Sequence, residues 1–136
     1  MQIYMLVSVR DFDRDYVGQT ENIARRFDEH NRGSGSQATS DPYYRPYCVA
    51  AYICGLSHFD RSQREHLEWK WKHYNDQVVA QGRTDLAERI DQGQRIVDEY
   101  NEHSPADEEI RLVVTIKRSI AERTHSARVV IDCSLD

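Results

Sequence analysis

No stretch of this 136-residue chain approaches the roughly 20 consecutive apolar residues that a membrane-spanning helix needs. Its first residues, Met1-Gln2-Ile3-Tyr4, also lack the basic and apolar regions of a secretory signal. We therefore expect no membrane partner and an intracellular location, cytoplasmic or nuclear. At this length the chain is expected to form one domain around one core.

Cysteine is scarce, and its spacing matches no common metal-binding or disulfide pattern. The three cysteines are an odd number, and none of them belongs to a C-x-x-C pair. This pattern argues against a zinc ribbon and against a disulfide framework. Cys48 and Cys54 lie in an apolar stretch, where a reduced thiol behaves as a small hydrophobic side chain.

An excess of positive charge is also missing, because 23 acidic residues outnumber 18 basic ones and the formal net charge is −5. Proteins that bind nucleic acid are usually basic over their contact face, so the total argues against such a partner. The distribution is more favourable, since several arginines cluster between residues 25 and 45 while much of the acidic charge follows Asp76. A local basic surface is therefore compatible with the sequence.

The first half of the chain predicts a β-hairpin, a helix and a third strand. β-Branched and aromatic residues without helical spacing favour the strands. Thr20 is a suitable N-cap for the helix, whose inward stripe contains Ile23 and Phe27. We expect strands over residues 2–9, 16–19 and 46–56, a helix over 21–31 and a loop over 33–45.

The second half predicts two amphipathic helices and then short strands. Asp60 and Gln63 form the signature of a capping box, and Gly82 separates the two helices. The expected helices run from residue 61 to 81 and from 85 to 102, with strands near 110–116 and 129–133 and a hairpin across 118–126. The predicted fold is α/β (α+β layering): a small central antiparallel three-stranded sheet flanked by helices. Residues 1–81 form the core, and residues 82–136 form a helix and strand extension packed on it.

The segment from Tyr16 to His30 contains residue types that are suited to binding a phosphate. Asn22, Arg26 and His30 are spaced four apart, so they share one face of the predicted helix. A guanidinium can bond two phosphate oxygens at once. A phenol can activate water if its pKa of about 10 is lowered. Taken alone, a surface arginine and a packed tyrosine are the more ordinary explanation.

Three motifs stand in order: Q-I-Y at residues 2–4, Y-V-G at 16–18, and R-R-F-D-E-H at 25–30. This arrangement resembles the GIY-YIG family of endonucleases. The resemblance implies that Arg26 is catalytic and that Tyr4 and Tyr16 line the same site, with His30 close by. The later E-W-x-W pattern resembles the family's metal-binding helix and implies that Glu68 holds one divalent cation, Mg²⁺ or Mn²⁺.

Within the family, the chain is most similar to the catalytic subunits of eukaryotic structure-selective nucleases that cut flaps and Holliday junctions. The similarity extends from Gln2 to about His73. It implies duplex or branched DNA as substrate and a regulatory protein partner. Three features depart from those nucleases: Gln2 replaces the glycine that opens the first motif, the loop after Gly33 is not basic, and their cysteine-rich zinc module is absent from the sequence.

The resulting hypothesis is metal-dependent hydrolysis of a DNA phosphodiester. Arg26 would stabilise charge on the phosphate, Tyr16 or Tyr4 would activate water, and His30 would bond a tyrosine or the phosphate. Two alternatives stay open: a catalytically weak module that binds nucleic acid or protein, and a hydrolase of RNA or a small phosphodiester. The residues expected to bind substrate are Asn22, Arg25, Arg32 and Arg45.

Overall fold

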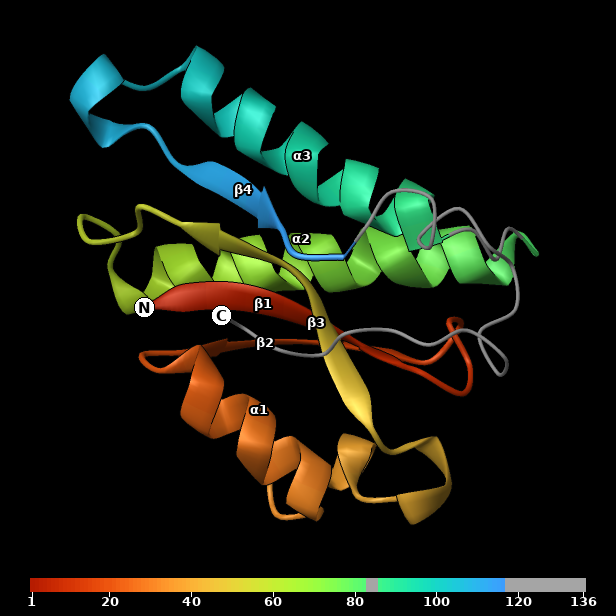
Figure 1. Cartoon of the computed structure of the whole chain (residues 1–136). Helices are drawn as coiled ribbons and strands as arrows, with labels where there is room; N and C mark the ends of the chain where they lie inside the picture. Colours follow the sequence, from red (N-terminus) through yellow and green to blue (C-terminus); the bar gives the residue numbers. More distant parts are fainter. Residues whose placement is uncertain (83–85, 117–136) are drawn as a thin grey trace.

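The computed structural model describes residues 1–82 and 86–116, and it contains one antiparallel sheet with helices on both faces (Figure 1). The strand order is β2-β1-β3-β4. Helix α1 covers one face, while α2 and α3 lie on the other. The elements are β1 (Gln2–Ser8), β2 (Asp15–Thr20), α1 (Ile23–Arg32), η1 (Gln37–Thr39), η2 (Pro42–Tyr44), β3 (Tyr47–Cys54), α2 (Arg61–Ala80), α3 (Leu86–Glu102), η3 (Ala106–Glu108) and β4 (Arg111–Val114).

Strand β1 is central and is buried on both faces. Successive side chains of a strand point to opposite faces, so Ile3 and Met5 enter the larger core under α2 and α3. Tyr4 and Leu6 point the other way, toward α1. The β1–β2 pairing places Tyr4 opposite Gly18 and Leu6 opposite Tyr16, which brings the two motif tyrosines onto the same face.

Helix α2 begins as its sequence predicts. The Asp60 carboxylate accepts from the Gln63 backbone, and the Gln63 side chain accepts from the Asp60 backbone, which confirms the capping box. Trp71 lies in the core, where its indole nitrogen donates to the Arg89 carbonyl at 3.0 Å. A Cβ on Gly93 would lie 2.8 Å from the indole, so this glycine lets α3 approach α2 closely.

Several predictions of local structure were wrong. The sheet has four strands, because β4 pairs with β3 instead of lying outside the sheet. Helix α1 begins at Ile23, with Asn22 as its N-cap, since Thr20 still belongs to β2 and pairs with Gln2. Cys48 is disulfide-bonded, whereas Cys54 is a free thiol.

The strand and hairpin expected after residue 117 lie outside the described residues. None of the described helices is long and apolar enough to cross a membrane.

A buried ion pair joins α3 to the start of β2. The Arg89 guanidinium is fully buried and donates to the Asp15 carboxylate at 2.6 Å and to the Phe12 carbonyl. Burial raises the pKa of the Asp15 carboxyl, and the adjacent guanidinium opposes that shift. Asp15 immediately precedes Tyr16, so α3 fixes the backbone that carries a motif tyrosine.

Replacing Arg89 by methionine is expected to destabilise the protein by about 3–5 kcal/mol, because removing one partner leaves a buried carboxylate without its counter-charge. The double variant Arg89→Met/Asp15→Val should lose less free energy of unfolding than Arg89→Met alone. Urea unfolding at pH 7 measures both differences. A single variant within 1 kcal/mol of wild type would show that the pair is not a major determinant of stability.

Candidate active site

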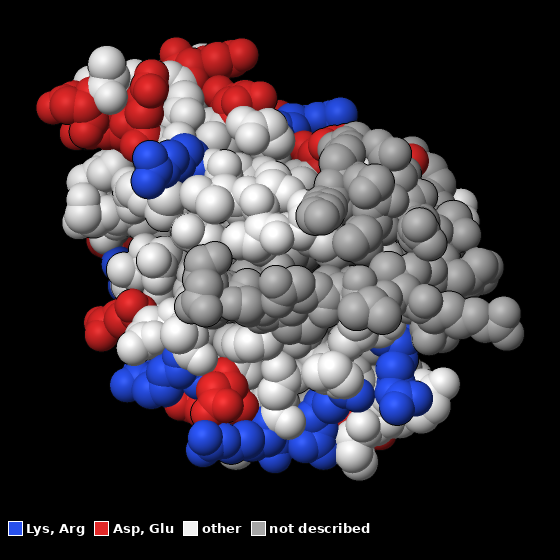
Figure 2. Space-filling view, viewed as in Figure 1, with Lys and Arg blue, Asp and Glu red and all other residues white. Residues whose placement is uncertain are grey.

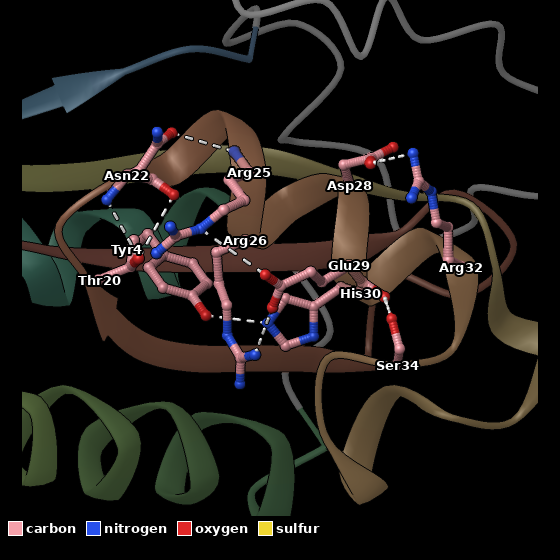
Figure 3. A network of polar contacts seen from close by, with 10 residues as sticks. All are labelled: Tyr4, Thr20, Asn22, Arg25, Arg26, Asp28, Glu29, His30, Arg32 and Ser34. Carbon is pink, nitrogen blue, oxygen red and sulfur yellow. Dashed lines mark hydrogen bonds and ion pairs between the residues drawn. The ribbon is translucent and has the colours of Figure 1, made fainter.

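The candidate site lies at the β2 edge of the sheet, between α1 on one face and the Lys72 side chain of α2, which reaches the Tyr16 ring. Tyr4 projects from β1 toward α1, and Arg26 and His30 project from α1 toward Tyr4 (Figure 3). Phe27 packs beside Tyr4 and holds the helix on the sheet. The four-residue spacing of Arg26 and His30 therefore places both side chains next to Tyr4.

His30 is fully buried and is bonded through both ring nitrogens. Its Nε2 lies 2.9 Å from the Tyr4 hydroxyl, and its Nδ1 lies 2.6 Å from the Thr39 hydroxyl. Burial and the nearby Arg26 charge lower the pKa of His30 to about 4, so the imidazole is neutral at physiological pH. Thr39 can donate to the Ser36 carbonyl at 3.3 Å. This network assigns the ring proton to Nδ1 and leaves Nε2 to accept from Tyr4.

Tyr4 keeps its proton. Burial, together with the neighbouring Tyr16, raises the pKa of the Tyr4 phenol to about 12, although a bond with Arg26 acts in the opposite direction. The Glu68 carboxylate adds a smaller upward contribution to the same pKa. Glu68, although distant in sequence, is therefore within electrostatic reach of the tyrosine.

Arg26 is held from two sides. Its guanidinium donates to the Glu29 carboxylate at 2.8 Å, and this bond, helped by Tyr4, raises the pKa of Arg26 above its ordinary value. The Arg26 side chain is 29% exposed, so part of its hydrogen-bonding edge faces solvent. A fixed and accessible guanidinium of this kind is suited to bind a phosphate.

Helix α2 adds Glu68 and Lys72 at the opposite side of the site. The Lys72 ammonium lies 3.8 Å from the Glu68 carboxylate and 5.7 Å from the centre of the Tyr16 ring. The Glu68 side chain is 18% exposed, so it is partly sheltered but reachable. The structure thus brings together Tyr4, Tyr16, Arg26, His30 and Glu68, which is the set that the motifs indicated.

Gly18 makes room for the tyrosines. A Cβ at this position would lie 2.8 Å from both the Tyr16 ring and the Tyr4 hydroxyl. The glycine of the Y-V-G motif is therefore needed here for close packing, since its φ is not positive.

The other predicted substrate-binding residues do not reach this cluster. Asn22 caps α1 by accepting from the Arg25 backbone at 3.0 Å. Arg25 and Arg32 are largely exposed and paired with Glu29 and Asp28. Arg45 donates toward two main-chain carbonyls, those of Asn31 and Ser40, and so joins the loop to the end of α1.

Three residues contribute to the site in ways that the sequence did not predict. Lys72 was considered only as an ion-pair partner of Glu68, although its four-residue spacing also predicts that it reaches the same side of α2. Thr39 and Gly35 support His30 from the following loop: Thr39 by its hydroxyl, and Gly35 because a Cβ there would lie 2.6 Å from the ring. No local pattern indicates those two, because the loop contacts depend on its folded path.

The low pKa of His30 predicts a pH dependence of stability. An unfolded histidine has a pKa of about 6.5, whereas His30 in the fold titrates at about 4. Between these values the unfolded chain binds the extra proton, so the free energy of unfolding falls as pH drops through that window. His30→Gln should reduce this slope, as measured by urea unfolding at several pH values. An NMR titration midpoint of the wild-type His30 ring near 6.5 would contradict the prediction.

Gly18→Ala is expected to destabilise the protein by about 1–3 kcal/mol, the usual cost of forcing extra atoms into a packed region. Tyr4→Phe removes one of the two clashing atoms. The double variant should therefore lose less stability than the two single changes added together, which thermal or urea unfolding can measure. Strict additivity would show that the alanine is not in contact with the Tyr4 hydroxyl.

Comparison with known proteins agrees with the geometry. A family model described as the GIY-YIG catalytic domain matches residues 1–78. The structure-specific endonuclease subunit slx1 of Talaromyces marneffei is 29% identical over 102 residues, covering 68% of this chain and 26% of the relative. This chain thus spans about a quarter of that relative's length. No solved structure gives a significant match. Since the matched segment is more than half of the chain and contains every residue of the site described above, this chain belongs to the GIY-YIG family of nucleases.

Proposed function

We propose that the protein is a metal-dependent endonuclease that hydrolyses phosphodiester bonds of DNA and prefers branched structures. The observation that carries the proposal is the convergence of Arg26, Tyr16 and Glu68, from three different elements, on one accessible site. The preference for branched DNA rests on the similarity to a relative named as a structure-specific endonuclease subunit. The word subunit in that name also supports a regulatory protein partner.

Arg26 would bind the scissile phosphate and stabilise the charge that develops on it. Its bond to Glu29 and its contact with Tyr4 fix the guanidinium before substrate arrives. Preorganised donors are effective because they need not reorient during the reaction. Arg25 and Arg32 would add more distant contacts to DNA, whereas Arg45 and Asn22 would act through the loop and the helix cap.

The two tyrosines would have different tasks. Tyr4 donates to His30, and the raised pKa of its phenol makes it a poor base. It would therefore position Arg26 and the phosphate while retaining its proton. Tyr16, whose ring lies beside the Lys72 ammonium, would orient the attacking water. His30 would keep Tyr4 oriented.

Glu68 fits a site for one divalent cation, Mg²⁺ or Mn²⁺. A single hard carboxylate oxygen suits Mg²⁺, which retains several waters and takes further ligands from a substrate phosphate. Among residues 1–82 and 86–116, no group of three or more His, Cys, Asp or Glu side chains could enclose a metal. When bound, the ion would supply Lewis-acid stabilisation of the phosphate and leaving-group oxygens.

We further propose that residues 1–81 form the nuclease core and that residues 82–136 are an extension packed on it. The family match to residues 1–78 supports the first part. The packing of α3 on α2 and the pairing of β4 with β3 support the second, for the described part of the extension. The Arg89–Asp15 pair suggests that this extension stabilises β2.

Arg26→Ala and Glu68→Gln are each expected to lower the cleavage rate by about 10²–10³-fold, as loss of a preorganised charge-stabilising group does. Labelled duplex, flap and four-way-junction DNA would be incubated with the protein in Mg²⁺, Mn²⁺ or EDTA. Arg61→Ala and Glu65→Gln are matched controls, because this exposed pair on α2 lies in the same helix as Glu68. The controls should cut like wild type.

Full activity of Arg26→Ala, or cutting that persists in EDTA, would contradict the proposed mechanism. DNA binding without cutting under every condition would favour the catalytically weak binding module. Equal cutting of all three DNAs would support the nuclease but contradict the preference for branched structures.

A further inference from the structure

Two arginines of the β1–β2 turn lie over tyrosine rings from the loop that follows α1. The Arg10 guanidinium carbon is 5.6 Å from the centre of the Tyr43 ring, and that of Arg14 is 4.4 Å from the centre of the Tyr44 ring. The two tyrosine rings are nearly perpendicular, with centres 5.1 Å apart. These four residues form a continuous surface, called here the Arg–Tyr patch.

The patch is held in place by a buried hydroxyl. Ser8 is fully buried, donates to the Tyr44 carbonyl at 2.7 Å and accepts from the Arg10 backbone at 3.1 Å. The Val9 backbone also donates to the Pro46 carbonyl at 3.1 Å. The arginine-bearing turn and the tyrosine-bearing loop are therefore fixed to each other. A preorganised surface loses little conformational freedom when a ligand binds.

The charges of the two patch arginines are available to bind an anion from solution. Among the described residues, no ion pair involves Arg10 or Arg14, although Arg25, Arg26 and Arg32 are all paired with carboxylates of α1. Both patch arginines are exposed, and Tyr43 is 62% exposed. A guanidinium stacked on a ring still presents its N–H edge to an anion. Figure 2 shows basic side chains gathered around α1 and acidic ones around the end of α3 and η3.

The patch adjoins the candidate active site. Arg14 precedes Tyr16 by two residues, which is about 7 Å of extended chain, and alternate residues face the same side. Tyr44 packs in the same cluster as Tyr4 and Tyr16. Arg14 also lines a groove that contains Asp13, Asp15 and Asp76, and of these Asp15 is paired with Arg89.

We propose that the Arg–Tyr patch binds backbone phosphates of the DNA strand next to the phosphate that is cut. This inference rests on the proposed function, because it extends the path of the same substrate from Arg26 past Tyr16 to Arg14 and Arg10. The guanidinium groups bind the phosphates, and the tyrosine rings hold the guanidinium groups in position. The patch supplies affinity and direction for the strand, and takes no part in the chemical step.

The double variant Arg10→Gln/Arg14→Gln tests the inference by DNA binding in EDTA, where cutting does not interfere. Its affinity at low salt should fall roughly tenfold or more, and the slope of log K against log salt should become shallower by about 2, since each lost phosphate contact removes about 0.9. Single-turnover cutting at saturating enzyme and Mg²⁺ should stay within about threefold of wild type.

Arg95→Gln/Arg111→Gln is the matched control, with the same change in net charge. Arg95 lies in a groove between α2 and α3, and Arg111 lies on β4, at the sheet edge away from β2. This control should retain the wild-type salt slope. Wild-type protein that binds and cuts DNA, together with a patch variant of unchanged affinity and slope, would overturn the inference alone. Wild-type protein that neither binds nor cuts DNA would overturn the proposed function and this inference with it.

Discussion

The hydrogen bond between the Tyr4 hydroxyl and His30 is the constraint on which the rest of the site depends. Tyr4 belongs to a central strand and is only 1% exposed, so its phenol must find a partner inside the protein. The partner comes from α1, and this fixes both the rotation and the depth of that helix on the sheet. Arg26, one turn earlier, is then directed to the same point. Thr39 and Gly35 complete the arrangement from the loop behind His30.

The electrostatics of the site follow from this buried pair. A neutral imidazole and a protonated phenol contribute no charge, so the charged side chains around the tyrosines form two pairs, Arg26 with Glu29 and Lys72 with Glu68. The overall charge of the chain is −5, yet two cations and two carboxylates meet here. The cations suit an anionic substrate, and a carboxylate suits a divalent ion. The acidic character of the protein lies elsewhere, notably around η3.

Much of the local structure could be predicted from the sequence, because it depends on neighbouring residues. The β-hairpin, the capping box at Asp60 and the shared face of Arg26 and His30 are of this kind. The N-cap of α1 was misplaced because Thr20 and Asn22 are both good caps, and only strand pairing with Gln2 excludes Thr20. The membership of β4 in the sheet, the Arg89–Asp15 pair and the Arg–Tyr patch each join residues far apart in sequence. No periodicity or motif indicates contacts of that kind.

The Arg89–Asp15 pair also bears on which part of the chain forms the structural unit around the motifs. The matched catalytic-domain model ends at residue 78, but a carboxylate beside a motif tyrosine is paired with a side chain from beyond that point. The catalytic-domain match and the packed structure around β2 therefore have different boundaries in this chain. A segment ending at residue 78 would keep all the motifs but lose the guanidinium that bonds the Asp15 carboxylate and the Phe12 carbonyl. The backbone that leads into Tyr16 would then have no connection to α3.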